Sequence, residues 1–437
     1  MLTGIRQFYL LILLIHEINH SHLPSTPALQ NRSLLTLLKY MAVFLPVVIY
    51  FIAVNNYAVN IPSQDDYDAI LNFLCAWKNA HGIDKFYLLF LQQSEHRILS
   101  SRIIYVVYDS IMGNINFRSL IFIGNIQLLL TFLIFISFIK KCLPRHWVLA
   151  SFVAGLCFFD LNNWENADFA MASMQNYGVV FLFSASMFFY SRKGKWNLFA
   201  GLLFQAICTY SSGNGIVASA LLAAFNILNG NRIHMYASSL AFIIFSPLYF
   251  LHYIPVHEDH RIPAVATMIT YFFRFASNHI YYGNNTLSAI AGVAILLILA
   301  FLLPVNKKLQ PKEDTVPLVC LLGFVIVSMI LASVFRAGFG DYIPSRYLVY
   351  PHLLIAILFV FLLIRFKDKK IITPLAVLFT VIVLIAYNMN CRSGLKGFAK
   401  LKETLKSTDY YYPRKDAAKQ AAEQSCRLKI YCIEQNR

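Results

Sequence analysis

Three aspartates, Asp65, Asp66 and Asp68, stand within a four-residue stretch of the sequence. Carboxylates this close repel one another, so the pKa of at least one should rise unless a cation compensates. A carboxylate with a raised pKa suits a general base that takes the proton of an acceptor hydroxyl. We therefore predict that Asp65 or Asp66 is catalytic and that Asp68 contacts substrate. The alternative is a solvated acidic turn that follows a helix.

Arginines accompany polar motifs in three other places. Arg102 follows the Glu95-His96-Arg97 motif, Arg336 ends one apolar stretch, and Ser345-Arg346-Tyr347 begins another. The planar guanidinium binds phosphate through parallel hydrogen bonds and keeps its charge when partly buried. The candidate substrate-binding residues are therefore Glu95, His96, Arg97, Arg102, Arg336, Arg346 and Tyr347. Ser345 has the residue type of a helix N-cap, a position that favours an anion. Each arginine could equally be an interfacial anchor on lipid headgroups.

A second acidic group, Asp160, Glu165 and Asp168, lies between two later apolar stretches. We predict that Glu165 contacts substrate. Because Mg²⁺ and Mn²⁺ prefer oxygen ligands, these carboxylates could bind such an ion together with Asp65 or Asp66. The spacing fixes no ligand set. The sequence therefore assigns no metal ligand, and Mg²⁺ or Mn²⁺ stays an alternative to a solvated loop.

Two further polar motifs are predicted to be loops. The run from His257 to His260 lacks the i, i+4 histidine spacing of helical zinc sites. The turn Ser212-Gly213-Asn214-Gly215 does not follow a strand, so it is predicted to be a tight reversal between helices.

The elements that must position these residues are apolar. Of the 437 residues, 58% are hydrophobic and 13% are charged, whereas soluble proteins carry roughly 25% charged residues. The net charge of +16 does not indicate a nucleic-acid partner, because the basic residues flank apolar stretches and form no basic, aromatic soluble segment.

The apolar stretches predict an all-α, polytopic transmembrane helix bundle of about eleven spans. The predicted spans are 34–54, 119–139, 146–160, 174–190, 197–211, 214–228, 234–251, 285–303, 315–335, 346–365 and 371–388. Arg102 and Asp109 interrupt the apolar segment 98–112, which we predict to be a half-buried helix near the membrane surface. It belongs to a long first outside loop with short helices.

The positions of lysine and arginine predict the topology. Five short loops on one side of the predicted bundle hold Lys140, Lys141 and Arg145; Arg192, Lys193 and Lys195; Arg232; Lys307, Lys308 and Lys312; and Arg365, Lys367, Lys369 and Lys370. That side should be cytoplasmic, which sends the acidic and arginine motifs outside. The prediction is a bacterial inner-membrane protein with a cytoplasmic segment 1–33, a transmembrane module 34–388 and a small periplasmic tail 389–437.

The tail holds three cysteines, Cys391, Cys426 and Cys432. In an oxidising compartment Cys426 and Cys432 could form a disulfide. Three unpaired thiols are the alternative.

The layout up to about residue 388 resembles the GT-C superfamily of integral membrane glycosyltransferases. Members of that superfamily have an acidic motif in a long first outside loop, directly after the first transmembrane helix, where this chain has Asp65, Asp66 and Asp68. The Glu95-His96-Arg97 motif, the turn at 212–215 and Ser345-Arg346-Tyr347 look like those of uncharacterised bacterial GT-C-like proteins. The chain has no second acidic pair like that of the metal-dependent oligosaccharyltransferases.

The resemblance implies an inverting glycosyltransferase that uses a polyprenyl-phosphate-linked sugar donor and a glycan or glycolipid acceptor. Asp65 or Asp66 would be the base, and arginines such as Arg97 and Arg346 would hold the departing lipid phosphate. Two other functions stay open. One is an O-antigen-type polymerase or ligase, and the other is a transporter or flippase of lipid-linked glycans, which would carry ionisable residues at mid-membrane depth.

Overall fold

The computed structural model describes residues 29–255, 263–281, 283–304, 313–340 and 342–433. Most of the predicted segment 1–33, the run from His257 to His260, and Lys307, Lys308 and Lys312 lie outside the described residues.

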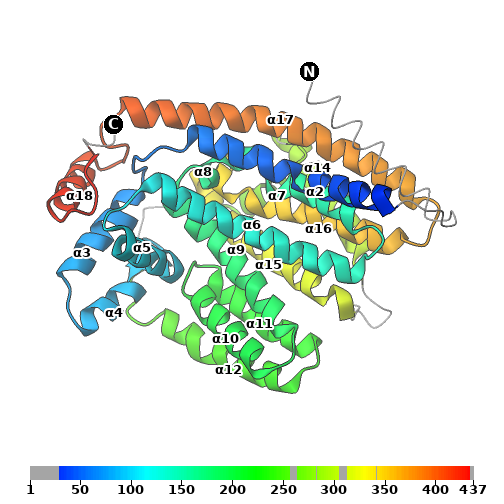
Figure 1. Cartoon of the computed structure of the whole chain (residues 1–437), viewed down its shortest axis with the longest axis horizontal. Coiled ribbons are helices and arrows are strands. Elements are labelled where there is room, and N and C mark those ends of the chain that lie inside the picture. The colour runs from blue at the N-terminus through cyan, green and yellow to red at the C-terminus, as the bar shows by residue number, and fades with distance from the viewer. Residues whose placement is uncertain (1–28, 256–262, 282, 305–312, 341, 434–437) are drawn as a thin grey trace.

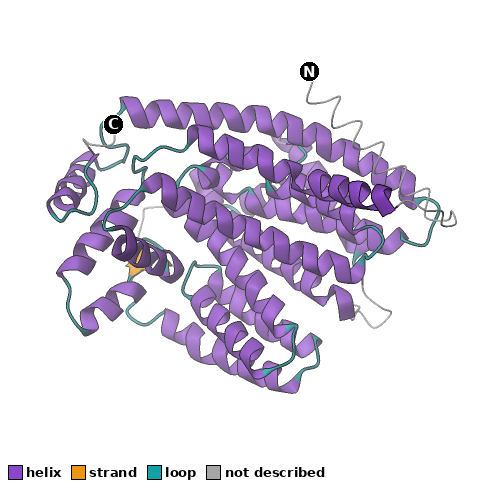
Figure 2. Ribbon diagram, in the orientation of Figure 1, coloured by secondary structure: helices purple, strands orange, loops and turns teal. Residues whose placement is uncertain are grey.

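The described residues form an all-helical bundle with one small strand pair (Figure 2). The first half of the chain contains α2 (Leu29–Tyr57), the π-helical turn η1 (Tyr67–Asn72), α3 (Phe73–Asn79), α4 (Ile83–Phe90), β1 (Gln92–Gln93), β2 (His96–Arg97), α5 (Leu99–Met112), α6 (Phe117–Cys142), α7 (Trp147–Phe158), the turn η2 (Leu161–Asn163), α8 (Trp164–Ala167), α9 (Ala170–Tyr190) and α10 (Lys195–Thr209). The second half contains α11 (Gly215–Leu228), α12 (Arg232–Tyr249), α13 (Val265–Ser277), α14 (Asn285–Leu302), η3 (Glu313–Thr315), α15 (Val316–Arg336), η4 (Ala337–Phe339), η5 (Ser345–Tyr347), α16 (Val349–Phe366), α17 (Ile372–Ser407) and α18 (Lys415–Arg427).

A helix occupies each of the eleven predicted spans, but six helical segments of the described chain are both long and apolar enough to cross a membrane. They are Thr36–Tyr57, Phe117–Cys142, Asn285–Leu302, Val316–Phe339, Ser345–Phe366 and Ile372–Ser407. The helix α7 has 12 residues, about 18 Å at 1.5 Å per residue, which is well short of a hydrocarbon core of about 30 Å. The fold class is therefore an all-α membrane bundle with six candidate spans.

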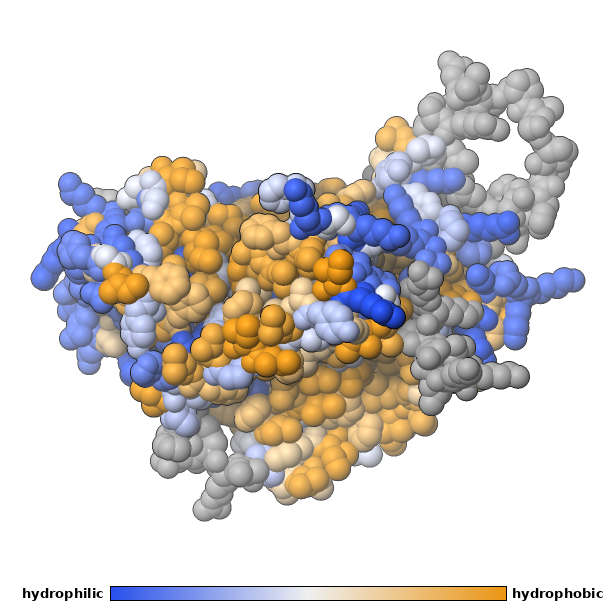
Figure 3. Space-filling view, turned by 90° about the horizontal axis from the view of Figure 1, so that it is seen from below, coloured by the Kyte–Doolittle hydropathy of each residue, from blue (hydrophilic) through white to orange (hydrophobic). Residues whose placement is uncertain are grey.

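The helix α16 lies at the centre of the bundle. In its most apolar window 89% of the residues are buried, against 22% for α14. The helix α14 exposes large apolar side chains along one broad face: Leu287, Ile290, Val293, Leu297, Ile298 and Phe301. Figure 3 shows apolar residues across the middle of one face of the molecule and hydrophilic residues gathered toward its ends. This distribution suits a protein surrounded by lipid.

The short elements of the predicted outside loop gather at one end of the bundle. Figure 1 shows α3, α4, α5 and α18 at the end where α17 finishes. Contacts tie this end together, because Arg118 donates to the backbone carbonyl of Asn55 over 3.0 Å and Lys402 donates to that of Asn56 over 2.7 Å. The predicted half-buried helix 98–112 is α5, which buries residues such as Tyr105 and exposes others such as Ile111.

The last predicted span and the start of the predicted tail form one continuous helix, α17, of 36 residues. Its middle packs directly on the backbone of η2. A Cβ on Gly394 would lie 2.0 Å from the carbonyl oxygen of Leu161, so no larger residue fits there without movement. This close approach fixes the loop after α7 against α17.

Candidate functional site

Asp66 is a buried anchor of the predicted first outside loop. Its Oδ2 accepts a hydrogen bond from the backbone N–H of Ser63 over 3.0 Å, and its Oδ1 accepts one from that of Met171, in the first turn of α9, over 2.9 Å. Burial raises the pKa of Asp66 to about 8, against the opposing effect of these two N–H groups. Because both oxygens are occupied by the backbone and 1% of the residue is exposed, Asp66 is a poor candidate for a base that must meet substrate.

Asp68 holds the C-terminal tail. Its Oδ2 accepts hydrogen bonds from the Tyr412 hydroxyl and, over 3.1 Å, from Nη2 of Arg414. Its Oδ1 accepts from the side-chain amide of Asn72 over 2.8 Å. The predicted substrate-binding side chain therefore already has partners within the protein.

Asp65 is the exposed carboxylate of the three. The protein around it still displaces enough water to raise its pKa, and desolvation is the largest cause. Attraction to Arg346 is the next largest influence and lowers the pKa; repulsion by Asp68 raises it, and Arg336 and Arg414 lower it further. Asp65 thus combines access to solvent with a position that faces two of the predicted arginines.

A reciprocal pair of hydrogen bonds fixes the backbone of Arg346. The N–H of Glu165 donates to Oγ of Ser345 over 2.9 Å, and the N–H of Arg346 donates to Oε2 of Glu165 over 3.0 Å. Asn166 adds a bond from Nδ2 to the carbonyl oxygen of Arg346 over 2.6 Å. We predicted that Ser345 caps its own helix; its side chain instead accepts a hydrogen bond from the backbone of a distant loop. Glu165 positions Arg346. Tyr347 is half-buried beside it.

Arg336 lies in the same region and pairs with the Glu95-His96 motif. Its Nη2 lies 2.7 Å from Oε2 of Glu95. His96 packs against the turn at 212–215, where a Cβ on Gly213 would lie 2.8 Å from Nδ1 of His96. Desolvation lowers the pKa of His96, which keeps the imidazole neutral at pH 7.

Two residues of α13 that the sequence analysis missed join this group. The hydroxyl of Tyr271 is buried without a hydrogen-bond partner among the described residues. Tyr271 interacts electrostatically with Arg274, Arg336 and Arg346. Tyr271 and Arg274 both lie outside the predicted spans, and no motif of the sequence marked them. We call Asp65, Tyr271, Arg274, Arg336 and Arg346 the arginine cluster.

Arg97 and Arg102 have a different role from the phosphate binding that we predicted. Arg97 is 6% exposed and donates from Nε to the carbonyl oxygen of Tyr249 over 2.7 Å and from Nη1 to that of Phe90. Arg102 is 3% exposed and donates to the carbonyl oxygen of Leu88 over 2.9 Å, as well as to that of Leu91. The carbonyls of Leu88, Phe90 and Leu91 lie at the C-terminal end of α4, and that of Tyr249 lies at the C-terminal end of α12. The helix dipole favours cations at both places. Both arginines therefore hold the loop and are not part of the arginine cluster.

The three acids between α7 and α9 do not share one metal site. Glu165 binds the Arg346 backbone, and both oxygens of Asp168 are buried without a hydrogen-bond partner among the described residues. Asp160 instead meets His279 and His352, two residues that the sequence analysis did not select. Among the described residues this is the group of three whose side chains could hold a metal ion.

The C-terminal tail closes with a disulfide between Cys426 and Cys432. The tail packs on the outside loop, where the N–H of Ile115 donates to the carbonyl oxygen of Ile430 over 2.8 Å and the Tyr431 hydroxyl donates to that of Asn60 over 2.7 Å. A hollow of about 410 Å³ lies beside the disulfide, lined by residues of the tail and of the 114–116 segment. None of the residues of the arginine cluster lines it.

Comparison of the sequence with protein-family models and with curated proteins finds no match in either set.

Proposed function

We propose that this protein is a glycosyltransferase that moves a sugar from a polyprenyl-phosphate donor to a cell-surface glycan or lipid. The observation that carries the proposal is the electrostatic attraction between the exposed Asp65 and two arginines, Arg346 and, more weakly, Arg336, at the polar end of an apolar helix bundle. A carboxylate that can accept a proton and arginines that can hold a phosphate are the two groups that the reaction needs.

In the proposed reaction the acceptor hydroxyl attacks the anomeric carbon of the donor sugar. Asp65 takes the hydroxyl proton as the new C–O bond forms. The bond between the anomeric carbon and the phosphate oxygen breaks, its electron pair stays on that oxygen, and polyprenyl phosphate leaves. Attack from the face opposite the phosphate inverts the anomeric carbon.

The arginines would act in two ways. They would neutralise the charge that grows on the departing phosphate, which is the stage at which stabilisation accelerates a reaction. A phosphate bound to Arg336 and Arg346 would also compete with Asp65 for these cations. Because their attraction lowers the pKa of Asp65, donor binding would raise that pKa and make Asp65 a stronger base.

The surroundings of the arginine cluster support a lipid-linked donor. The bundle exposes apolar side chains, so a polyprenyl chain could approach laterally from the bilayer. The lysine-rich loops favour a cytoplasmic location for the opposite end, and the disulfide of the tail suits an oxidising compartment. We therefore propose that the arginine cluster faces the periplasm of a bacterial inner membrane.

The test uses the purified full chain in nanodiscs with a panel of ¹⁴C-labelled polyprenyl-phosphate hexoses and pentoses, and envelope extract of a strain that lacks the gene as acceptor. We expect transfer of label with release of polyprenyl phosphate. Arg336→Ala and Arg346→Ala should each slow transfer about 10–100-fold, the effect of about 1.5–3 kcal/mol for a hydrogen bond to a charged group. Arg392→Ala, at an exposed position of α17, is the matched control. Uptake of the donor into vesicles without covalent transfer would instead indicate a transporter.

A polymerase or ligase of the O-antigen type is the second candidate. Such proteins rely on arginines in their outside loops, and three arginines interact electrostatically with Tyr271 here. The length of the product separates the two functions. One added sugar per acceptor supports the glycosyltransferase, whereas a ladder of lengthened chains or transfer of a preassembled glycan supports the second candidate.

A further inference from the structure

A polar group separate from the arginine cluster is buried in the bundle. Asp160 and His279 are each 0% exposed and His352 is 1% exposed. They come from three separate parts of the chain: the segment just after α7, the connection between α13 and α14, and the first turn of α16. Burial of an acid and two imidazoles is costly unless each finds a partner, so their convergence needs an explanation.

The three residues present their ligand atoms to one another. One such atom from each, a carboxylate oxygen or a ring nitrogen, lies within 4.8 Å of the other two. Oδ2 of Asp160 lies 3.4 Å from Nδ1 of His279. Two ligands of a tetrahedral zinc ion are about 3.3–3.5 Å apart, given metal–ligand distances of about 2.0–2.2 Å. The pair therefore already has the separation that such an ion requires.

His352 is not explained by hydrogen bonding within the protein. Both of its ring nitrogens are buried and have no hydrogen-bond partner among the described residues. Its ring meets that of His279 edge-on, with 4.8 Å between the ring centroids. A histidine placed only for packing would leave both nitrogens desolvated and unpaired, which destabilises the fold. A metal ion would take one of them as a ligand.

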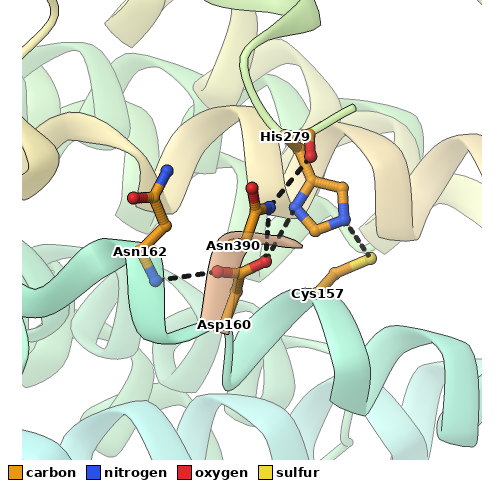
Figure 4. Close-up of polar contacts among 5 residues, drawn as sticks. All are labelled: Cys157, Asp160, Asn162, His279 and Asn390. Carbon is orange, nitrogen blue, oxygen red and sulfur yellow. Dashed lines mark hydrogen bonds and ion pairs between the residues drawn. The ribbon is translucent and has the colours of Figure 1, made fainter. Parts of the chain in front are cut away.

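Other residues hold the acid and the histidine in place, as Figure 4 shows. Nδ2 of Asn390 donates to Oδ2 of Asp160 over 2.8 Å and to the carbonyl oxygen of His279 over 3.0 Å. Nε2 of His279 lies 3.7 Å from Sγ of Cys157. Partners of this kind fix the orientation of metal ligands.

We propose that Asp160, His279 and His352 bind one divalent transition-metal ion, Zn²⁺ being the best match. Two imidazoles and one carboxylate suit zinc and related transition metals, whereas Mg²⁺ prefers oxygen ligands and retains bound water. The site is distinct from the oxygen-only site considered from the sequence, and it does not depend on the glycosyltransferase proposal.

The bound ion would fasten the loop that positions Arg346. Asp160 begins the 160–168 loop, whose Glu165 holds the Arg346 backbone, and His352 lies on α16, just after Arg346. One ion would therefore join both sides of the Glu165–Arg346 contact. We assign it a structural role.

Metal content of the full chain tests the proposal. The protein is purified in detergent through a tag without histidines from cells grown with added Zn²⁺, and its metals are measured by mass spectrometry. We expect about one zinc per chain in the wild type and less than about one tenth of that in His279→Gln and His352→Gln. His234→Gln is the matched control, because His234 is also a buried histidine of a helix and contacts the Tyr190 carbonyl oxygen; it should retain the metal.

Asn390→Ala gives an intermediate result if the site is built as proposed. Loss of a residue that orients a ligand typically weakens metal binding about 10–100-fold, which a titration with a zinc chelator measures. The wild type stripped of metal and loaded with Co²⁺ should show visible absorption stronger than that of aqueous Co²⁺, because nitrogen and oxygen ligands of the protein replace water. The Co²⁺ experiment on the wild type tests metal binding even if the histidine variants fail to fold. A wild type that binds neither metal, or a His352→Gln variant that keeps its zinc, overturns the proposal.

Discussion

At the scale of single residues, three neighbouring carboxylates have three different environments. Asp66 accepts from a backbone N–H 105 residues away, and Asp68 accepts from a hydroxyl 344 residues away. Asp65 stays exposed beside distant arginines. The sequence predicted the cluster, but it could not divide the roles, because each role is set by a partner that folding brings from another segment.

The roles of the arginines likewise could not be assigned from the sequence. Arg97, Arg102, Arg336 and Arg346 are equivalent by residue type and by position near the predicted membrane boundary. Arg97 and Arg102 bind backbone carbonyls at the end of α4. Arg336 and Arg346 instead attract Asp65. The position at which α4 ends therefore separates the two pairs. No pattern in the sequence marks Arg274, which lies in a short helix that the predicted spans did not include.

The pKa of Asp65 predicts how transfer depends on pH. The carboxylate accepts a proton only in its ionised form, so the rate should fall as pH falls through its pKa. Because that pKa is raised, the midpoint of the acid limb should lie above the ordinary value of about 3.9. Arg346→Gln removes the strongest attraction that lowers this pKa and should move the midpoint to higher pH. Rates of transfer between pH 4 and pH 9 measure both effects, and a shift to lower pH in the variant would contradict the assignment.

Asp66→Asn should destabilise the protein and not merely inactivate it. An amide offers one acceptor oxygen where the carboxylate uses two, so one buried N–H loses its partner at a cost of about 1–3 kcal/mol. The fall in the thermal unfolding temperature in detergent measures the loss of stability. Asp84→Asn, at an exposed position of the same outside loop, should leave the unfolding temperature unchanged. Equal stability of the two variants would contradict the anchoring role.

At the scale of elements, the apolar periodicity predicted the positions of helices more reliably than it predicted which of them are long enough to span a membrane. All eleven predicted spans are helical, yet α7 and α11 have 12 and 14 residues. Apolar segments of this length are typical of helices buried inside a protein, whereas a membrane span needs about 20 residues. Neighbouring helices decide between the two, and these contacts are not encoded in the local pattern.

The reciprocal hydrogen bonds of the Ser345–Glu165 contact join α8 to η5. Ser345→Ala and Glu165→Ala each break one half of the reciprocal pair, so each should slow transfer by loosening Arg346. Because the two residues act together, the double variant should be less impaired than the product of the single effects, with a coupling of about 0.5–3 kcal/mol. A double-variant cycle on transfer rates measures it, and strictly additive effects would mean that the contact does not position Arg346.

At the scale of the whole molecule, the asymmetry between the two ends could be predicted from charge alone. The lysine-rich loops and the acidic motifs alternate along the sequence, and the short helices of the outside loop collect at one end of the bundle (Figure 1). The buried Asp160–His279–His352 group could not be predicted, because its members stand 119 and 73 residues apart in the sequence and follow no ligand spacing.

The proposed orientation predicts which end reagents reach from outside. In intact spheroplasts a membrane-impermeant maleimide should label Asp84→Cys, in the outside loop, and should not label Lys369→Cys, between α16 and α17. Cys426 and Cys432 should resist alkylation until a reductant is added, because they form a disulfide. Labelling of position 369 and not of position 84 would reverse the topology and exclude the periplasmic site.

The exposed carboxylate among the three aspartates is the centre of this account, and one comparison tests it most directly. Transfer of label from the polyprenyl-phosphate sugar is measured for the wild type, Asp65→Asn and Asp84→Asn at the pH of maximum activity. Loss of a general base typically costs about 10²–10⁴-fold in rate, so Asp65→Asn should lose transfer by that factor while it stays folded and still binds the donor. Asp84→Asn should match the wild type. Undiminished transfer by Asp65→Asn would contradict the account.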